Sequence, residues 1–200
     1  MQVLACGAND EAAIRLRSWL RSRGLPMPNQ AVIEEFLRQL NEAGEGASPR
    51  MDCGDYVMQR YADAVYVLPE LPDLQPEVAL TLSVECGCVI EGVGSLTLIP
   101  AAVEGFALAD GEVLRIAWRA GGERCRPNRR ARSQTLKKLL QERGVPPWWR
   151  AHVPLVCSGD EILAVGDLWV CESSRLRQAP QDNSPLWQLH WQRNTFAGMD

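Results

Sequence analysis

The spacing of apolar residues changes at a proline-rich stretch, and this change constrains the fold more than any other feature of the chain. Residues 69–76 read PELPDLQP, with three prolines in eight positions. Before this stretch apolar side chains recur at helical spacing, whereas beyond it they alternate with polar ones as in a half-buried strand. Because clustered prolines interrupt helices and strands alike, we expect a linker here between two differently built units.

The first unit is expected to hold two helices and a β-hairpin. Residues 10–23 have helical spacing and are followed by Gly24, beyond which two prolines forbid continuation. Asn29 can cap a second helix that carries one clear apolar stripe. Strands near 51–61 and 65–68 would then form the hairpin.

The second unit is expected to be mainly antiparallel β-sheet with one short helix. Alternating apolar residues predict strands around 78–84, 96–98, 113–119 and 187–191. Ser133 can cap the helix, which Gly144 would close. Residues 161–171 are apolar enough for one buried strand, or for a strand bent at Gly166.

These elements together predict an α+β fold in two parts. The expected divisions are a helical and hairpin unit at 1–69, a linker at 70–76, a β-rich unit at 77–192 and a tail at 193–200. No apolar run approaches the roughly 20 residues that span a bilayer, and the first residues lack a basic segment typical of a signal peptide. We therefore expect no membrane partner and a cytoplasmic location.

Charge is distributed unevenly along the chain, whose formal net charge is −4. Residues 1–114 carry a net −10 and residues 151–200 a net −3, whereas residues 115–150 carry a net +9. Within this basic block, residues 124–132 read RCRPNRRAR, with five arginines and no acidic residue. We call these nine residues the arginine segment.

The arginine segment favours an anionic ligand. Arginine binds phosphate through two parallel hydrogen bonds, and a helix N-terminus would add backbone N–H groups. Both are expected together here, because the segment leads into the helix that Ser133 is predicted to cap. Trp148 and Trp149 follow, and an exposed indole can stack on a base, so we expect one of them in the core and one exposed. The competing interpretation is a solvated charged loop beside two buried tryptophans.

Other kinds of site have weaker support. The seven cysteines include no CxxC pair, and Cys86-Gly-Cys88 alone is no zinc site, so reduced thiols without a metal are expected. The only histidines are His152 and His190, and each is expected to be structural or solvated. None of the glycine-rich stretches matches a phosphate-binding loop.

Several short motifs occur here in an order that resembles a known family. They include GGER at 121–124, LKK at 136–138, PPW at 146–148 and LWV at 168–170. This part resembles the C-terminal domain of bacterial tRNA(Ile)-lysidine synthetase. The first unit is similar to that family's central substrate-binding domain, through these further pieces: GLPMP at 24–28, EEFLRQL at 34–40, ASPR and GDY within 47–56, and the RYADAVYVLP hairpin. The resemblance covers roughly residues 10–175.

The resemblance implies an ATP-dependent carbon–nitrogen ligase that joins lysine to the wobble cytidine of an isoleucine tRNA with a CAU anticodon. The family's catalysis belongs to an N-terminal domain with an SGGxDS loop, which this sequence lacks. The implied ATP, Mg²⁺ and lysine sites are therefore expected to be missing, with no catalytic, cofactor or metal residue in this chain. Alone, the chain is expected to be inactive.

In this family the two C-terminal domains hold the tRNA, so the resemblance and the charge pattern point to the same segment. The expected tRNA contacts are Arg124, Arg126, Arg129, Arg130, Arg132, Lys137 and Lys138, with Arg115 and Arg119 as outer candidates and Trp148 as a weaker one. The sequence departs from the family at Cys53 and Tyr56, where tryptophans are expected, and at residues 128–130, where a glycine is common.

Two alternatives remain open at the level of sequence. The basic loop could belong to a protein-interaction module that meets an acidic partner surface, including the acidic first unit of the same chain. A small independent enzyme that uses the cysteines or His152 would require an exposed thiol with a low pKa.

Overall fold

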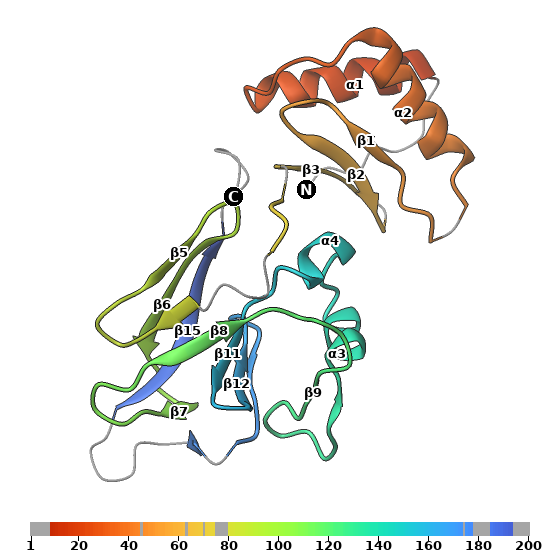
Figure 1. The fold of residues 1–200 in the computed structure, drawn as a ribbon. Helices are drawn as coiled ribbons and strands as arrows, with labels where there is room; N and C mark the ends of the chain where they lie inside the picture. Colours follow the sequence, from red (N-terminus) through yellow and green to blue (C-terminus); the bar gives the residue numbers. More distant parts are fainter. Residues whose placement is uncertain are drawn as a thin grey trace. The chain divides into compact units, whose positions relative to one another are not determined.

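The structure, a computed structural model, describes residues 9–44, 46–62, 64–69, 71–74, 80–173, 175–177 and 185–193. The chain divides into two units between Leu71 and Pro72, within the stretch predicted to be a linker (Figure 1). Residues 75–79 of the predicted linker and first β-strand lie outside the described residues, as does the predicted tail after Arg193.

The first unit consists of two helices and a three-stranded antiparallel sheet. Its elements are α1 (Asn9–Ser22), α2 (Gln30–Glu42), β1 (Arg50–Asp52), β2 (Val57–Tyr61) and β3 (Ala64–Leu68), in the sheet order β1-β2-β3. The predicted hairpin is confirmed as β2 and β3, in which Tyr61 pairs with Ala64. Residues predicted to start its first strand form the separate β1, because the chain turns at Gly54 before β2 begins.

Local sequence signals fix the two helices of this unit. Gly24 follows α1 with a φ of 66°, which a glycine adopts readily. The side chain of Asn29 accepts a hydrogen bond from the Val32 N–H at 3.0 Å, so the predicted cap of α2 is confirmed. The apolar faces of both helices then pack with the sheet around Phe36 and Met58, which are fully buried.

The second unit is built from two five-stranded antiparallel sheets, a two-stranded ribbon and two short helices (Figure 1). The first sheet has the order β13-β12-β11-β8-β4, with β4 (Leu80–Leu82), β8 (Leu114–Ala117), β11 (Leu155–Ser158), β12 (Glu161–Val165) and β13 (Trp169–Val170). The second has the order β14-β7-β15-β6-β5, with β5 (Cys88–Ile90), β6 (Gly94–Pro100), β7 (Gly105–Ala107), β14 (Leu176–Arg177) and β15 (Leu186–Arg193). The ribbon pairs β9 (Arg124–Cys125) with β10 (Gln134–Thr135), and the helices are α3 (Leu136–Glu142) and α4 (Pro147–Arg150).

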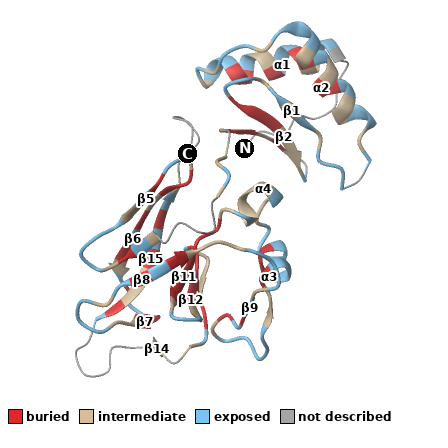
Figure 2. Ribbon diagram, in the orientation of Figure 1, coloured by how far each residue is buried: buried red, intermediate tan, exposed pale blue. Residues whose placement is uncertain are grey.

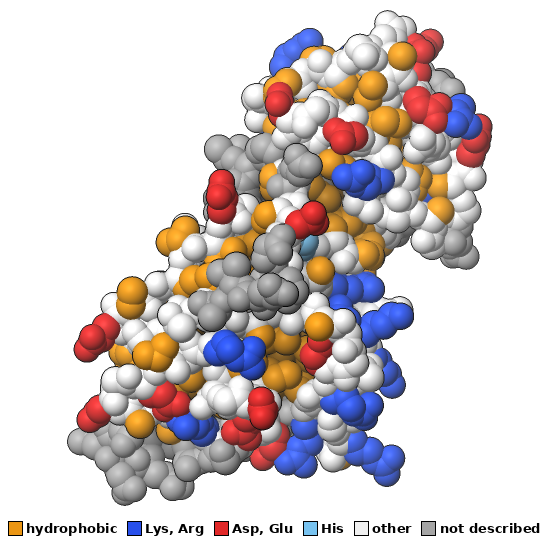
Figure 3. Space-filling model, viewed as in Figure 1, with side chains coloured by type: hydrophobic (Ala, Val, Ile, Leu, Met, Phe, Trp, Pro, Cys, Tyr) orange, Lys and Arg blue, Asp and Glu red, His pale blue; other side chains and the backbone are white. Residues whose placement is uncertain are grey.

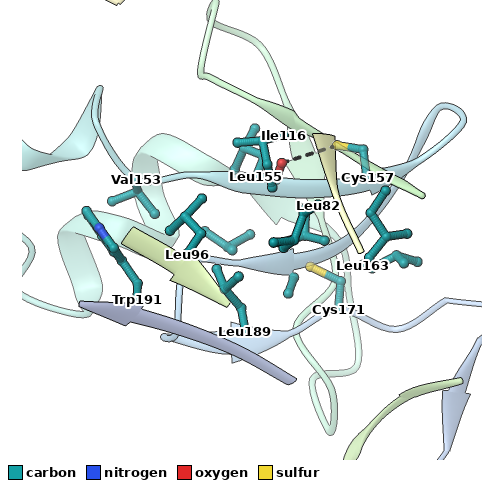
Figure 4. Close-up of a cluster of buried hydrophobic side chains, with 14 of the residues drawn as sticks. Leu82, Leu96, Ile116, Val153, Leu155, Cys157, Leu163, Cys171, Leu189 and Trp191 are labelled. Atoms are coloured by element: carbon teal, nitrogen blue, oxygen red, sulfur yellow. Dashed lines mark hydrogen bonds between the residues drawn. The ribbon is translucent and has the colours of Figure 1, made fainter. Parts of the chain in front are cut away.

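Both sheets and α3 share one hydrophobic core, which is separate from the core of the first unit (Figure 2). Figure 4 shows leucines from the two sheets in this cluster, Leu82 and Leu155 from one sheet and Leu96 and Leu189 from the other. Helix α3 adds three buried leucines from one face, which matches the predicted stripe. Its opposite face is therefore left in solvent.

The structure confirms the α+β class and corrects two details. Residues 161–171 do not form one strand, because the chain reverses at Gly166, whose φ is 51°, and β13 pairs back onto β12. The second unit also contains two helices where one was expected, the added one being the four-residue α4. None of the described helices is long and apolar enough to cross a membrane.

Candidate nucleic-acid interface

The arginine segment is anchored through its backbone and two buried side chains. Cys125 and Pro127 are buried, while the neighbouring Arg124 and Arg126 are exposed, as expected when alternate residues face the core. The Asn128 N–H donates to Val170 O at 3.0 Å, and the Glu172 N–H donates to Arg126 O at 2.7 Å. The backbone is thus held without using an arginine side chain.

A tight turn at residues 127–130 gives the segment its tip. The Arg130 N–H donates to Pro127 O at 3.1 Å, and Arg129 adopts a positive φ of 65°. A residue with a Cβ is disfavoured in this conformation, where glycine fits without strain. The turn directs the Arg129 side chain outward, with 71% of its surface exposed.

The helix that follows the segment does not begin as predicted. Ser133 does not cap α3, because Gln134 and Thr135 are drawn into a strand that pairs with Cys125 and Arg124. Thr135 occupies the cap position without a side-chain hydrogen bond, and the Leu136 N–H donates to Glu123 O at 3.0 Å. The predicted Ser133 cap is therefore wrong, and the candidate surface is described by its positive side chains.

Three arginines of the segment pair with carboxylates from other elements of the same unit. The distances are 3.5 Å for Arg126–Glu172, 3.6 Å for Arg129–Glu104 and 2.7 Å for Arg130–Glu142. The hydrogen bond from Arg130 lowers the pKa of Glu142, so this carboxylate is charged at neutral pH. Exposed pairs of this kind contribute about 0–1 kcal/mol, so a phosphate can replace the carboxylate at little cost.

Other cations of the block have no carboxylate within 4 Å among the described residues. They are Arg115, Arg124, Arg132, Lys137, Arg143 and Arg150, of which Arg124 donates to Ser133 O at 3.0 Å. Lys138 lies 3.8 Å from Glu142, one turn along α3. Figure 3 shows Lys and Arg side chains gathered along the side of this unit where Figure 1 draws α3 and β9. The surface therefore keeps an excess of positive charge.

The two outer candidates, Arg115 and Arg119, differ in exposure. Arg115 is exposed on β8 and donates to Gly159 O at 3.2 Å. Arg119 has only 17% of its side chain exposed and lies 3.9 Å from Glu123. Burial alone would raise the pKa of Glu123, but backbone N–H groups and Arg119 lower it overall. Arg119 therefore stabilises the chain at Glu123, just before the segment, and offers little of its side chain to solvent.

Trp148 and Trp149 are both half-buried, so the prediction of one tryptophan in the core and one exposed is wrong. Trp149 packs against the core and meets Trp191 edge to face, with ring centroids 5.7 Å apart. Trp148 is half-buried on α4. His152 places Nδ1 2.9 Å from Trp148 O and Nε2 2.9 Å from Pro72 O, so it joins α4 to the backbone at Pro72. This histidine has a structural role, and His190 is exposed on β15.

Sequence reasoning did not identify the acidic partners of the segment. Glu104 and Glu172 lie far from it along the chain, and no local pattern reveals such pairs. Glu142 stands four residues after Lys138, and that helical spacing could have predicted their pairing. Arg143, exposed just after α3, was counted in the basic block but not chosen as a contact.

Two family models match the chain in the order of its two units. The model described as the TilS substrate binding domain matches residues 12–66, and the TilS substrate C-terminal domain matches residues 114–191. The second match contains the whole arginine segment and α3.

Curated relatives named tRNA(Ile)-lysidine synthase align along most of the chain. The tRNA(Ile)-lysidine synthase of Serratia proteamaculans is 30% identical over 192 residues, which is 96% of this chain and 42% of the relative. That of Alkalilimnicola ehrlichii is 33% identical over 171 residues, with 84% of this chain and 38% of the relative covered. The chain thus spans about two fifths of the length of these relatives. It belongs to the tRNA(Ile)-lysidine synthase family, of which it carries the substrate-binding domain and the C-terminal domain.

Proposed function

We propose that this chain binds and positions tRNA for a tRNA(Ile)-lysidine synthase. In this proposal the ligase joins lysine to the wobble cytidine of an isoleucine tRNA with a CAU anticodon, using ATP, and these 200 residues take no part in the bond-forming steps. The observation that carries the proposal is the arginine segment, whose guanidinium groups project from a backbone held by its own hydrogen bonds.

The proposed contacts are to the RNA backbone rather than to bases. Double-stranded RNA presents phosphates and 2′-hydroxyl groups, and its deep major groove excludes side chains. The contacts proposed are those predicted from the sequence, Arg124, Arg126, Arg129, Arg130, Arg132, Lys137 and Lys138, with Arg115 in an outer position. Arg119 and Trp148 are weaker members, because neither is fully exposed.

ATP and Mg²⁺, which the family implies, do not fit the residues of this chain. The sequence contains no SGGxDS loop. No group of three or more His, Cys, Asp or Glu side chains that could hold a metal ion occurs in the described part of the chain. We therefore assign no step of the ligation to these residues.

The test is a titration of tRNA at several salt concentrations. Each phosphate contact contributes roughly 0.9 to the slope of log affinity against log salt. The double variant Arg129→Ala, Arg130→Ala should lower this slope by about 2 and weaken binding by roughly 10- to 100-fold near 0.1 M salt. Isoleucine and methionine tRNAs titrated side by side will show whether this chain takes part in choosing the tRNA.

A control variant outside the segment separates local contact from general attraction. Arg193→Ala removes one positive charge from β15, where Arg193 pairs with Asp167 at 2.6 Å, outside the arginine segment. The slope should be unchanged in this variant. If the double variant keeps the slope and affinity of the parent chain, the arginine segment is not the tRNA contact. An acidic protein partner would then be the better candidate.

A further inference from the structure

Two cysteines lie together beneath the arginine segment. Pro127 of the segment forms an antiparallel bridge with Cys171, and Cys125 stands two residues before Pro127, so both thiols face the same side of the paired backbones. Each thiol perturbs the pKa of the other, as expected of two neighbouring sulfurs, although the residues are far apart in the sequence. Both are free thiols.

These thiols are covered by protein but border an open pocket. Cys125 is 7% exposed and Cys171 is 1% exposed, and both belong to the core of the second unit. Both also line a pocket of about 330 Å³, together with Arg124, Arg126 and Ser133 of the arginine segment and β9–β10 connection. A water molecule occupies about 30 Å³ in the liquid, so a small neutral oxidant fits into this space.

The two thiols are chemically unequal. The Cys171 side chain lowers the pKa of Cys125, whereas the Cys125 side chain and burial raise the pKa of Cys171. The thiolate is the species that oxidants attack, and a second thiol nearby can resolve the product. Cys125 is thus the group that reacts first, and Cys171 is placed to react with it.

We propose that Cys125 and Cys171 are a site of reversible oxidation, at which a hydroperoxide forms a disulfide that ties the arginine segment to the strand beside it. The Cys125 thiolate attacks one peroxide oxygen, the O–O bond breaks, and sulfenic acid and hydroxide result. The Cys171 sulfur then attacks the Cys125 sulfur, the S–O bond breaks, and water leaves with the Cys171 proton. Two thiols and one hydrogen peroxide thus give one disulfide and two waters.

The disulfide would enclose the basic surface in a covalent loop. Residues 126–170 lie between the two cysteines, and they contain the rest of the arginine segment and all of α3. Such a bond requires the two sulfurs to approach to roughly 2.0 Å. It would restrict opening of the segment, because a covalent bond would be added to the backbone hydrogen bonds at Arg126 and Asn128 and to the Arg126–Glu172 ion pair. This chemistry does not depend on the proposed tRNA binding.

The test begins with hydrogen peroxide and the unaltered chain. After oxidation, free thiols are alkylated and the protein is digested without reductant. The masses of its peptides are then measured by mass spectrometry. A peptide pair joined through Cys125 and Cys171, about 2 Da lighter than the two reduced peptides together, is the expected product. It should disappear on treatment with dithiothreitol. Alkylation of both cysteines at a dose that oxidises exposed Cys86 would overturn the proposal.

Variants separate this pair from the other thiols. Cys157→Ser is the matched control, because Cys157 is also buried in this core but bonds to Leu155 O and does not line the pocket. The joined peptide should persist in Cys157→Ser. In Cys171→Ser it should be replaced by a sulfenic acid at Cys125 that a dimedone probe captures. If a variant does not fold, the presence or absence of the joined peptide in the unaltered chain is the test of the proposal.

The effect on the arginine segment is measured by limited digestion with trypsin. Cleavage after Arg126, Arg129, Arg130 and Arg132 should be several-fold slower in the oxidised chain and should recover on reduction. Cleavage after arginines of α1 should not change. If the segment is cut at the same rate in both states, the disulfide does not restrain it, and that part of the proposal is wrong.

Discussion

Two turns in the described part of the chain hold a non-glycine residue at a positive φ, and they differ in what the side chain does. Ala62, with a φ of 51°, follows β2 in the hairpin of the first unit, and its carbonyl accepts a hydrogen bond from Arg60. Arg129, with a φ of 65°, forms the tip of the arginine segment. Ala62 has a single methyl group, whereas Arg129 presents a charged group to solvent.

The comparison indicates why the conformational cost is tolerated at each place. A left-handed residue with a Cβ costs about 1–2 kcal/mol, and glycine would avoid the cost at both positions. At Ala62 the conformation serves only the reversal of the chain between paired strands. At Arg129 it also sets the direction of a guanidinium group beside Arg130. Strain retained where the side chain is charged and exposed is consistent with a binding role.

The largest expected effect comes from removing the core beneath each turn. Leu136→Ala in α3 and Met58→Ala in β2 each delete a fully buried side chain and should cost about 2–5 kcal/mol of unfolding free energy. Because the two residues belong to separate cores, each change should loosen mainly its own unit. Hydrogen exchange followed peptide by peptide measures this directly.

The arginine segment should lose amide protection in Leu136→Ala and not in Met58→Ala. Its amide protection is expected to fall in Leu136→Ala, because the cavity left in the core loosens the start of α3, where the backbone N–H is bonded to Glu123 O just before the segment. In Met58→Ala the hairpin of the first unit should lose protection and the segment should keep it. Equal loss in both units after either change would mean that the chain unfolds as one cooperative body.

A smaller effect is expected from glycine at the two strained positions. Arg129→Gly and Ala62→Gly each relieve the left-handed strain but add roughly 0.5–1 kcal/mol of unfolded-state entropy, so both should stabilise the chain by about 0.5–1 kcal/mol. Urea unfolding gives the change. Only Arg129→Gly should weaken tRNA binding, with a salt slope lower by about 1. Ala62→Gly is therefore its matched control, and a weaker affinity in both variants would disprove a local role for Arg129.

Local signals in the sequence place both helices and the hairpin of the first unit. The Asn29 cap, Gly24 and the turn near Ala62 each act within a few residues, and the structure has α2, the end of α1 and the hairpin where these signals predict them. In the second unit the predicted start of α3 at Ser133 is wrong, although serine is a good capping residue. Pairing of Gln134 with Cys125 determines that region, and no pattern of neighbouring residues shows which strand will be its partner.

The same distinction applies to the candidate interface. The excess of arginines is visible in composition, and the outward face of Lys137 and Lys138 follows from the helical spacing of the leucines. The low exposure of Arg119 and the ion pair between Arg129 and Glu104 depend on how distant segments pack. The tRNA contacts themselves stay a prediction.

The smallest expected effect is a change in the pKa of a carboxylate paired with an arginine. It distinguishes a paired arginine that binds RNA from one that does not. On α2 the hydrogen bond from Arg38, with a second from Gln39, lowers the pKa of Glu35 to about 2, and in the second unit the bond from Arg130 lowers the pKa of Glu142 below its usual 4.5. Each lowered pKa stabilises the folded chain above the unfolded value of 4.5, and the contribution is lost as the pH falls through the folded value. If a phosphate takes Arg130, Glu142 keeps only the more distant Lys138 of its two cationic partners and its pKa should rise toward 4.5, while Glu35 stays unchanged. Carboxyl ¹³C shifts followed during acid titration, with and without an RNA hairpin, measure both groups, and an unchanged Glu142 curve in the bound state would show that Arg130 stays with its carboxylate.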